Sequence, residues 1–368
     1  KDSAIPALND ILLAECGHLG IKYEEAIVDE PSRLVQNKTK RDASSTNEAG
    51  RLVYRKRALA LEDIAALKPF HWGYEFDQIL DAGGFDAIIT NPPWDVLQAD
   101  EKEFFQKYDD TVQKKKIDIK EWRSRFADFM KNEDLRHAWL TYASGFGHLI
   151  SWIKQSVQYQ CQRKGKINLY AVFVEQCFNL LRPGGYCGIV IPSGIYTDLG
   201  TKQLREMLFG ETTVTGLFCI ENRKEVFEGV HRSFKFVIMS FEKGGKTERF
   251  PAAFMRHDVA ELERFPQEGA IEISVPLVRR LAPDSLSVME FKNPLDVQIA
   301  EKMLKFPLLG ERLENVWNIS LMQEFNMTTD SHLFKTEPGP GRLPLYEGKM
   351  IWHFEHRFAE GKWWVSEA

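Results

Sequence analysis

The chain has 368 residues, 43% of them hydrophobic and 27% charged, enough to bury one substantial core and to leave material for a second, smaller domain. Its net charge of −5 excludes the strongly basic surface of a non-specific nucleic-acid binder, so any contact with a nucleic acid must be local. No apolar run approaches the roughly 18 residues of a membrane span and no signal peptide opens the chain, so we expect a cytoplasmic protein without a membrane partner.

The five cysteines are scattered without the paired spacing of a zinc site or of a disulfide framework, which fits a reducing compartment. Cys177 and Cys187 lie in apolar runs and are predicted to be core residues. The chain begins at Lys1 and not at a methionine, so we expect it to be a fragment of a longer protein.

Residues 1–60 are predicted to form an N-terminal segment that is partly helical and partly loop. Pro31–Gly50 is rich in Ser, Thr, Asn, Asp and Lys, which is the composition of an exposed loop. Further along, Gly83-Gly84 forms a turn before the β-branched run Phe85–Thr90, and two prolines follow that run. This pattern predicts a buried strand that stops at a loop.

Residues 97–166 contain no proline and many Lys, Glu, Gln, Phe, Trp and Tyr residues, which predicts a mainly helical insertion. Its basic cluster Lys114–Lys116, together with Trp122, Arg123 and Arg125, allows two interpretations. One is a lid that faces a nucleic acid. The other, which charge runs favour, is a solvated helix face.

From residue 168 onward, helices alternate with strands. Asn168–Leu181 has a helical period and ends at Arg182-Pro183-Gly184-Gly185, after which Tyr186–Ile191 is a second buried strand. One more helix and two more strands are predicted over Thr201–Phe209, Val214–Ile220 and Phe234–Phe241. We expect these last two strands to pair antiparallel at the sheet edge. The alternation predicts an α/β fold with a mainly parallel sheet and helices on both faces.

After residue 245 this alternation gives way to short segments separated by prolines. We therefore expect a catalytic core over residues 61–250, a linker over 251–294 and a separate C-terminal region over 295–368.

The motif that carries chemistry is Asn91-Pro92-Pro93-Trp94. It follows the predicted strand directly, so it lies at the carboxyl end of a strand, where open α/β sheets bind ligands. An amino group conjugated with a ring is a poor nucleophile, and two acceptors aimed at its hydrogens free its lone pair. The Asn91 side chain and the Pro92 carbonyl are candidate acceptors on a backbone that the prolines restrict, and no strong general base is then obligatory. Trp94 offers a flat face to an aromatic base. The alternative is a loop in which Asn91 only caps a turn.

These residues resemble a known family. Gly84–Trp94 is similar to motif IV of amino-methyltransferases, and later segments resemble the later motifs of those enzymes in the same order. The later segments are Asn168–Glu175, Leu180–Gly185, Ile191–Tyr196, Glu221–Phe227 and Phe234–Met239. The order is that of gamma-class DNA adenine-N6 methyltransferases, and the likeness extends to large restriction and phage-defence methylases of the type IIG and DISARM kinds. Leu343–Ile351 resembles the start of their target-recognition region.

The resemblance implies a Rossmann-like class I methyltransferase sheet, of which this chain would lack the N-terminal part. It also implies transfer of a methyl group from S-adenosylmethionine to adenine N6 in double-stranded DNA after base flipping, with further domains or subunits of a restriction or defence system as partners. Asn91 and Pro92, with Pro93 beside them, would hold the amino group, and Trp94 would stack on the flipped adenine. Phe227 would pack against its other side, although a core phenylalanine is as good an interpretation.

One departure from the family concerns the cofactor. These enzymes bind S-adenosylmethionine through a glycine-rich turn after the first strand, and no such turn is found in the chain. The nearest candidate, Cys16-Gly17-His18-Leu19-Gly20, follows a helical stretch and is interpreted as a helix end. The cofactor-binding residues are therefore unassigned, and our hypothesis is that they lie upstream in a longer protein.

Two other functions stay open. The same Asn-Pro-Pro-aromatic pattern serves protein glutamine-N5 methyltransferases, and a non-catalytic DNA-binding subunit of a defence complex is a second alternative. The Glu-x-Lys spacings at Glu347–Lys349 and Glu360–Lys362 occur in nucleases but have little specificity. His353, Glu355 and His356 invite a metal site, but so short a cluster is more often a surface feature, so no metal is expected.

Overall fold

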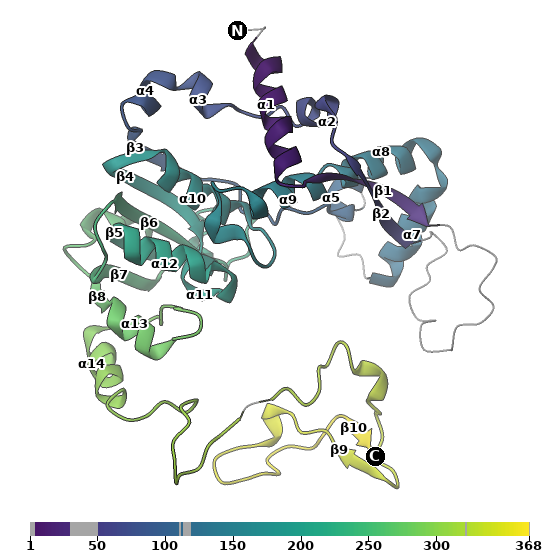
Figure 1. Ribbon diagram of the computed structural model, residues 1–368. Coiled ribbons are helices and arrows are strands. Elements are labelled where there is room, and N and C mark those ends of the chain that lie inside the picture. Colours follow the sequence, from purple (N-terminus) through teal and green to yellow (C-terminus); the bar gives the residue numbers. More distant parts are fainter. Residues whose placement is uncertain (1–3, 30–50, 110–111, 113–118, 321, 368) are drawn as a thin grey trace. The chain divides into compact units, whose positions relative to one another are not determined.

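The computed structural model describes residues 4–29, 51–109, 112, 119–320 and 322–367 (Figure 1). They form two compact units, one that ends at Leu304 and one that begins at Lys305. Within these described ranges, no helix combines the length and the apolar character that crossing a membrane requires.

The first unit is built on one six-stranded mixed sheet with the strand order β3-β4-β6-β5-β7-β8. The strands are β3 (Phe85–Thr90), β4 (Leu181–Pro192), β5 (Thr212–Glu221), β6 (Lys235–Lys243), β7 (Arg249–Arg256) and β8 (Ile271–Ser274). The pairs β3–β4 and β5–β7 are parallel, while β6 is antiparallel to both of its neighbours and β8 is antiparallel to β7. The predicted α/β fold is confirmed, but the sheet is mixed and not mainly parallel.

One face of the sheet packs against helices. These are α10 (Leu169–Leu180), α11 (Gly194–Thr197), α12 (Lys202–Glu211), α13 (Val275–Leu281) and α14 (Pro294–Met303). The core beneath them contains aliphatic and aromatic strand residues, among which Leu181, Ile189, Ile191, Val237 and Phe241 are fully buried. The other face is covered over β5 to β7 by loop side chains and by the short 3-10 helix η4 (Val259–Arg264).

The turn before β3 requires glycine. Gly84 has φ = +121°, and a Cβ atom there would lie 2.4 Å from the Leu180 carbonyl oxygen. The predicted Gly83-Gly84 turn is therefore confirmed, and it brings the start of β3 against the end of α10.

The place of β6 differs from the prediction. Its antiparallel pairing with β5 was expected at the sheet edge, but β6 lies between β4 and β5. The physical reason is its apolar character on both faces. Val237 and Met239 are buried under the helices, and Phe236 is buried on the opposite face, as a central strand requires.

The segment 251–294 is not a linker. It contains most of β7, all of β8 and α13, and its Ala252 and Ile273 are completely buried in the sheet core. The boundary between the two units falls at Leu304 and Lys305. The prolines that suggested a linker have other roles, because Pro251 lies within β7 and Pro276 stands in the first turn of α13, where proline is tolerated.

The N-terminal residues form a helix and a β-hairpin next to α2. The elements are α1 (Ala4–His18), β1 (Lys22–Asp29), β2 (Arg51–Ala58) and α2 (Leu61–Ala66). The predicted helix end at Cys16–Gly20 is confirmed, because the Ile21 amide bonds the Cys16 carbonyl and Gly20 has φ = +68°. The loop predicted over 31–50 lies outside the described residues. Two short helices, α3 (Trp72–Glu75) and α4 (Asp77–Asp81), then lead to β3.

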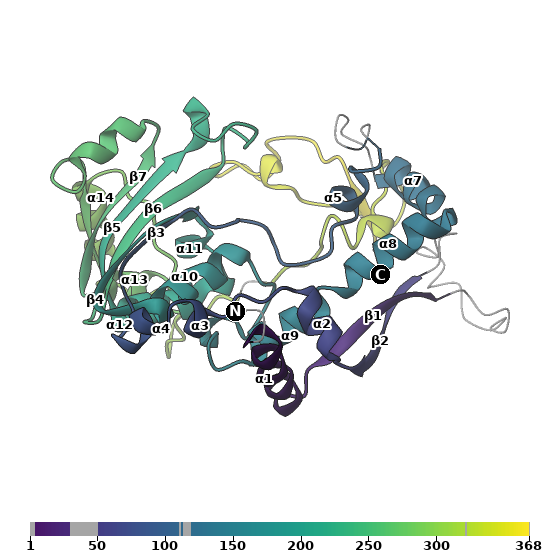
Figure 2. The same cartoon turned by 90° about the horizontal axis from the view of Figure 1, so that it is seen from above.

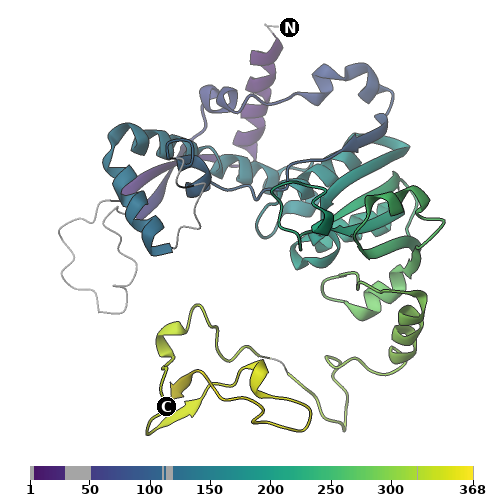
Figure 3. The same ribbon diagram turned by 180° about the vertical axis from the view of Figure 1, so that it is seen from behind.

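Between residues 101 and 155 the described chain is mainly helical. The helices are α5 (Glu101–Phe105), α7 (Ile119–Lys131), α8 (Glu133–Ser144) and α9 (Gly147–Gln155), and Figure 3 shows them beside the β1–β2 hairpin. Trp122 is a core residue whose ring N–H donates to Glu101, and Arg123 and Arg125 pair with carboxylates of the same region. This favours a structural and solvated role over a lid; Lys114–Lys116 lie outside the described residues.

The second unit has little regular structure. Its strands β9 (Arg342–Pro344) and β10 (Trp364–Ser366) pair antiparallel, and short turns join them. Met350 is buried, and Lys349 pairs with Glu347. In the part of the chain that the structure describes, no group of three or more His, Cys, Asp or Glu side chains is placed to hold a metal ion.

A buried histidine joins the helical region to the hairpin. His148 of α9 is 4% exposed, stacks on Tyr23 of β1 with ring centroids 5.1 Å apart, and has no hydrogen-bond partner on either ring nitrogen. Burial lowers the pKa of His148, because the charged ring would lose its hydration.

We predict that this histidine makes the fold acid-sensitive. The unfolded chain takes up the proton near the ordinary pKa of about 6.5, whereas the folded chain resists it, so stability is full above that pH and falls below it. Between pH 7.5 and 5.5, urea unfolding should show wild type losing about 1 kcal/mol more than His148→Phe. His137→Gln, an exposed control, should behave like wild type. Equal acid losses in wild type and His148→Phe would contradict the prediction.

Candidate active site

The motif Asn91-Pro92-Pro93-Trp94 begins where β3 ends. Because β3 and β4 are parallel, with Thr90 opposite Ile189, the loop after β3 and the loop after Pro192 leave the sheet at the same edge. Asn91 and Pro93 are exposed there, while Pro92 is buried. Figure 2 shows the chain leaving β3 at this edge and running toward α5.

The far end of the motif loop is tied to the start of α10. The Leu169 amide donates to the Asp95 carbonyl over 2.9 Å, and the Leu97 amide donates to the Ile167 carbonyl over 2.8 Å. With the strand on one side and these bonds on the other, the Asn91 and Pro92 carbonyl groups sit on a short loop that is fixed at both ends.

Trp94 lies in an aromatic cluster. Its ring N–H donates to the Val190 carbonyl of β4 over 3.2 Å. Its ring centroid is 5.1 Å from that of Phe227, 5.7 Å from that of Phe234 and 6.2 Å from that of Phe236. The structure thus brings together Trp94 and Phe227, two predicted site residues that are far apart in sequence.

The loop that carries Phe227 is held by Asn222, which follows β5 directly. Asn222 is completely buried, and its side-chain oxygen accepts from the Phe227 amide over 3.0 Å. Its side-chain N–H₂ group donates to the carbonyls of Phe227 and Val230, each over 2.9 Å. The sequence reasoning missed both Asn222 and Phe234. Their only signal was that they lie in Glu221–Phe227 and Phe234–Met239, two segments that resemble later motifs of amino-methyltransferases.

A buried arginine holds the loop after β4 in place. Arg205 of α12 is 2% exposed and donates to the main-chain carbonyls of Ile195, Asp198 and Ser285 at 2.6 to 2.7 Å. Burial lowers the pKa of its guanidinium to about 10, which leaves it charged at neutral pH. A cation that bonds three carbonyls in this way fixes the shape of residues 194–198 next to the motif loop.

Charged side chains at this edge neutralise one another. Lys235 donates to Glu290 over 2.6 Å, which raises the pKa of Lys235, and Glu290 also accepts from the Tyr196 hydroxyl. Glu221 pairs with Arg223 over 2.8 Å, and this hydrogen bond lowers the pKa of Glu221. The edge therefore offers fixed hydrogen-bond acceptors and aromatic surface to a ligand.

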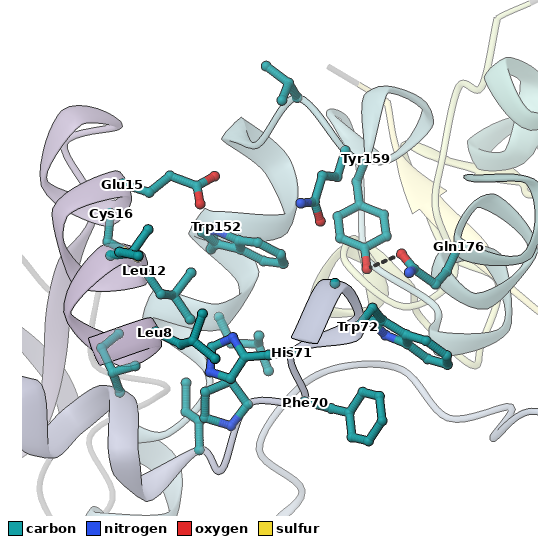
Figure 4. Close-up of a pocket in the computed structure, with 18 of the residues that line it drawn as sticks. Leu8, Leu12, Glu15, Cys16, Phe70, His71, Trp72, Trp152, Tyr159 and Gln176 are labelled. Atoms are coloured by element: carbon teal, nitrogen blue, oxygen red, sulfur yellow. Dashed lines mark hydrogen bonds between the residues drawn. The ribbon is translucent and has the colours of Figure 1, made fainter. Parts of the chain in front are cut away.

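A large cavity lies in another part of the first unit. It has a volume of about 920 Å³ and is lined by residues of α1, α2, α9, the C-terminal end of α10 and the segment around α3 (Figure 4). Leu12, Cys16, Phe70, Trp72 and Trp152 give it a mainly apolar wall. None of the motif residues lines it, so it is separate from the candidate active site.

Comparison with known proteins gives the chain a family likeness. A family model described as Eco57I restriction-modification methylase matches residues 22–127 and 149–227, about half of the chain. A Methanocaldococcus jannaschii protein named as a type II restriction enzyme and methyltransferase is 23% identical over 293 residues. That match covers 73% of this chain and 20% of that protein, so the chain spans about a fifth of the length of this relative.

Among solved structures, the chain resembles one from a type I restriction-modification system, with 13% identity, 61% of this chain and 42% of that chain covered, and a TM-score of 0.33. A modification subunit of a type I restriction enzyme from Vibrio vulnificus YJ016 has 12% identity, coverages of 54% and 35%, and a TM-score of 0.31. The type IIG restriction endonuclease BpuSI has 17% identity, coverages of 44% and 20%, and a TM-score of 0.28.

We predict that Asn222→Ala loosens the loop that carries Phe227. The substitution removes three partly buried hydrogen bonds and leaves main-chain groups without partners, which should lower the free energy of unfolding by about 2 kcal/mol. Hydrogen exchange followed by mass spectrometry should show faster exchange over residues 223–234 than in wild type. The control is Asn179→Ala, which removes one exposed bond to Gln158. Unchanged exchange in 223–234 would mean that Asn222 does not hold the loop.

Proposed function

Because the chain belongs to the Eco57I restriction-modification methylase family, we propose that it is the catalytic segment of an S-adenosylmethionine-dependent DNA adenine-N6 methyltransferase. Its proposed biological role is restriction-modification or phage defence, with double-stranded DNA as substrate. The observation that carries the proposal is the position of Asn91-Pro92-Pro93-Trp94 at the carboxyl edge of β3, with Phe227 in ring contact with Trp94. This one edge supplies hydrogen-bond acceptors and stacking surface for a flipped base.

The proposed chemistry of the base follows from the two acceptors. The Asn91 side-chain oxygen and the Pro92 carbonyl each accept one hydrogen of the adenine amino group. The nitrogen then becomes pyramidal, and its lone pair leaves conjugation with the ring and becomes available for attack. Fixed acceptors of this kind need no reorganisation during the reaction, because the loop is anchored at both ends. Trp94 stacking offsets much of the free energy lost when the base leaves the duplex.

The described part of the chain offers no set of residues that fits the methyl donor beside Asn91. A glycine-rich turn after a strand would have to lie next to Asn91, yet β3 is the end strand of the sheet and carries β4 on one side only. Ile89 of β3 is 90% exposed, although strands in parallel pairs are normally covered. Open α/β sheets bind ligands between two neighbouring strand ends. We infer that another segment of the whole protein adds a strand beside β3 and carries the cofactor turn.

Protein glutamine methylation and a purely DNA-binding role remain the competing functions. A methylation experiment separates both of them from adenine methylation.

We predict that Asn91→Ala lowers methyl transfer to adenine about 100-fold or more, because one of the two acceptors is lost. The measurement is mass spectrometry of N6-methyladenine in unmethylated plasmid DNA treated with the complete protein. Asn179→Ala, at the opposite end of α10, should retain wild-type activity. Equal methylation by wild type and Asn91→Ala would show that Asn91 has been misassigned. Methylated glutamine in cell protein treated in parallel, without methylated adenine in the plasmid, would identify the protein methyltransferase. DNA binding without either methylation would identify the binding subunit.

We also predict that the 368-residue chain on its own binds S-adenosylmethionine weakly or not at all. The physical reason is the open outer edge of β3, where no described strand supplies a turn that a cofactor can approach closely. Isothermal titration calorimetry with the isolated chain tests this directly. A low-micromolar dissociation constant would overturn the inference that the cofactor turn lies elsewhere in the protein.

A further inference from the structure

Four aromatic rings meet beside the motif loop, and their angles differ. Phe234 lies almost parallel to Trp94, with 12° between the ring planes, and Phe236 lies at 26°. Phe227 is steeply inclined to Trp94 at 72° and to Phe236 at 83°. The rings of Phe234 and Phe236 are therefore nearly parallel to the indole ring, while Phe227 meets the indole ring edge-on.

The two near-parallel rings come from one strand face. Phe236 belongs to β6, and Phe234 is the residue just before the first residue of that strand. The two phenylalanines are two positions apart, so their side chains point to the same side of the sheet. Phe236 is 2% exposed and buried in the cluster, whereas Phe234 is 37% exposed. Phe234 is thus the outer of the two rings that support Trp94.

A base does not fit between Trp94 and Phe227 as they stand. A ring stacked on both sides needs about 7 Å between the outer ring planes, twice the contact distance of stacked carbon atoms. The centroids of Trp94 and Phe227 are only 5.1 Å apart, and the rings are not parallel. If the proposed function holds, one of the two rings must move when adenine enters.

The contacts indicate which ring stays. Trp94 is held by its hydrogen bond to Val190 and by the rings of Phe234 and Phe236. The Phe227 ring packs edge-on against Trp94 and Phe236, and Asn222 holds its main chain. Phe227 lies in a stretch of mostly exposed residues, so we take it as the ring that turns about its side-chain bonds while Asn222 keeps the backbone in place.

We propose that Phe234 is a positioning residue for base capture: it holds the Trp94 indole in the plane on which the flipped adenine stacks, while Phe227 turns aside to admit the base. This inference rests on the proposed function. Phe234 touches Trp94 and not the reacting atoms, so its effect on the base passes through the indole. An aromatic pair of this kind combined with base stacking makes the expected effect about tenfold in affinity.

The test is a thermodynamic cycle between the residue and the base. The sequence methylated by the wild-type complete protein is first mapped in plasmid DNA. Two duplexes are then made, one with an unpaired adenine at the target position and one with an abasic site there. Binding is measured without methyl donor for wild type, Phe234→Ala, Phe234→Leu and Phe234→Tyr. Phe306→Ala serves as a control, because Phe306 is 69% exposed and lies in the second unit.

We expect Phe234→Ala to weaken binding of the adenine duplex about tenfold and of the abasic duplex less than about twofold. Phe234→Leu should resemble Phe234→Ala, and Phe234→Tyr should recover wild-type discrimination because it restores a parallel ring. Equal weakening on both duplexes, or full recovery by leucine, would overturn the proposal and show a general packing role. A wild type that does not distinguish adenine from the abasic site would refute stacking on Trp94, whatever Phe234 does. A complete protein that methylates no adenine in the mapping step would refute the proposed function.

Discussion

The parallel pairing of β3 with β4 is the constraint on which the candidate site depends. It sets Thr90 opposite Ile189 and so places the next residue of each strand at one common edge. From that register the Trp94 ring N–H reaches the Val190 carbonyl. A slip of one residue would turn every β3 side chain to the opposite face and carry the motif loop away from this carbonyl. The site is thus set by main-chain pairing before any of its own side chains contributes.

Around this register, the structure holds each surrounding loop by a buried polar side chain that bonds main-chain groups. Arg205 does so for the loop after β4, and Asn222 does so for the loop after β5. In both cases the side chain takes the place of regular secondary structure, because loop carbonyls and amides in a buried place need partners. The loops can therefore be irregular in path and still fixed in position.

The sequence was sufficient for the features that depend on local pattern. The strand Phe85–Thr90, the helix end at Cys16–Gly20 and the glycine turn before β3 all follow from neighbouring residues, and all are present. The strand was predicted to be buried, but it is the end strand of the described sheet, and Ile89 is 90% exposed. The position of β6 between β4 and β5 was not predictable in this way, because strand order depends on contacts between distant segments. Pro251 misled for a related reason, since a proline inside a strand looks like a break until its neighbours are known.

The site shows the same division. Asn91 and Trp94 were identified from four adjacent letters and a chemical argument, whereas Phe227 came only from family resemblance. Asn222 was not predicted as a site residue because its partners are main-chain atoms of other residues, which leave no pattern in the sequence. Phe234 was assigned to the start of a strand, and nothing in its local sequence shows that it lies parallel to a ring 140 positions earlier.

The reversed direction of β6 determines how its side chains are oriented at the site. Parallel strands reach this edge with their last residues, which pass at once into loops, so their side chains take whatever direction the loop allows. An antiparallel strand begins at this edge, so its first side chains already alternate between the two faces of the sheet. Phe236 faces the motif loop, while Val237 faces the helices. One inserted strand therefore gives a site built from loops one side with the rigidity of a sheet.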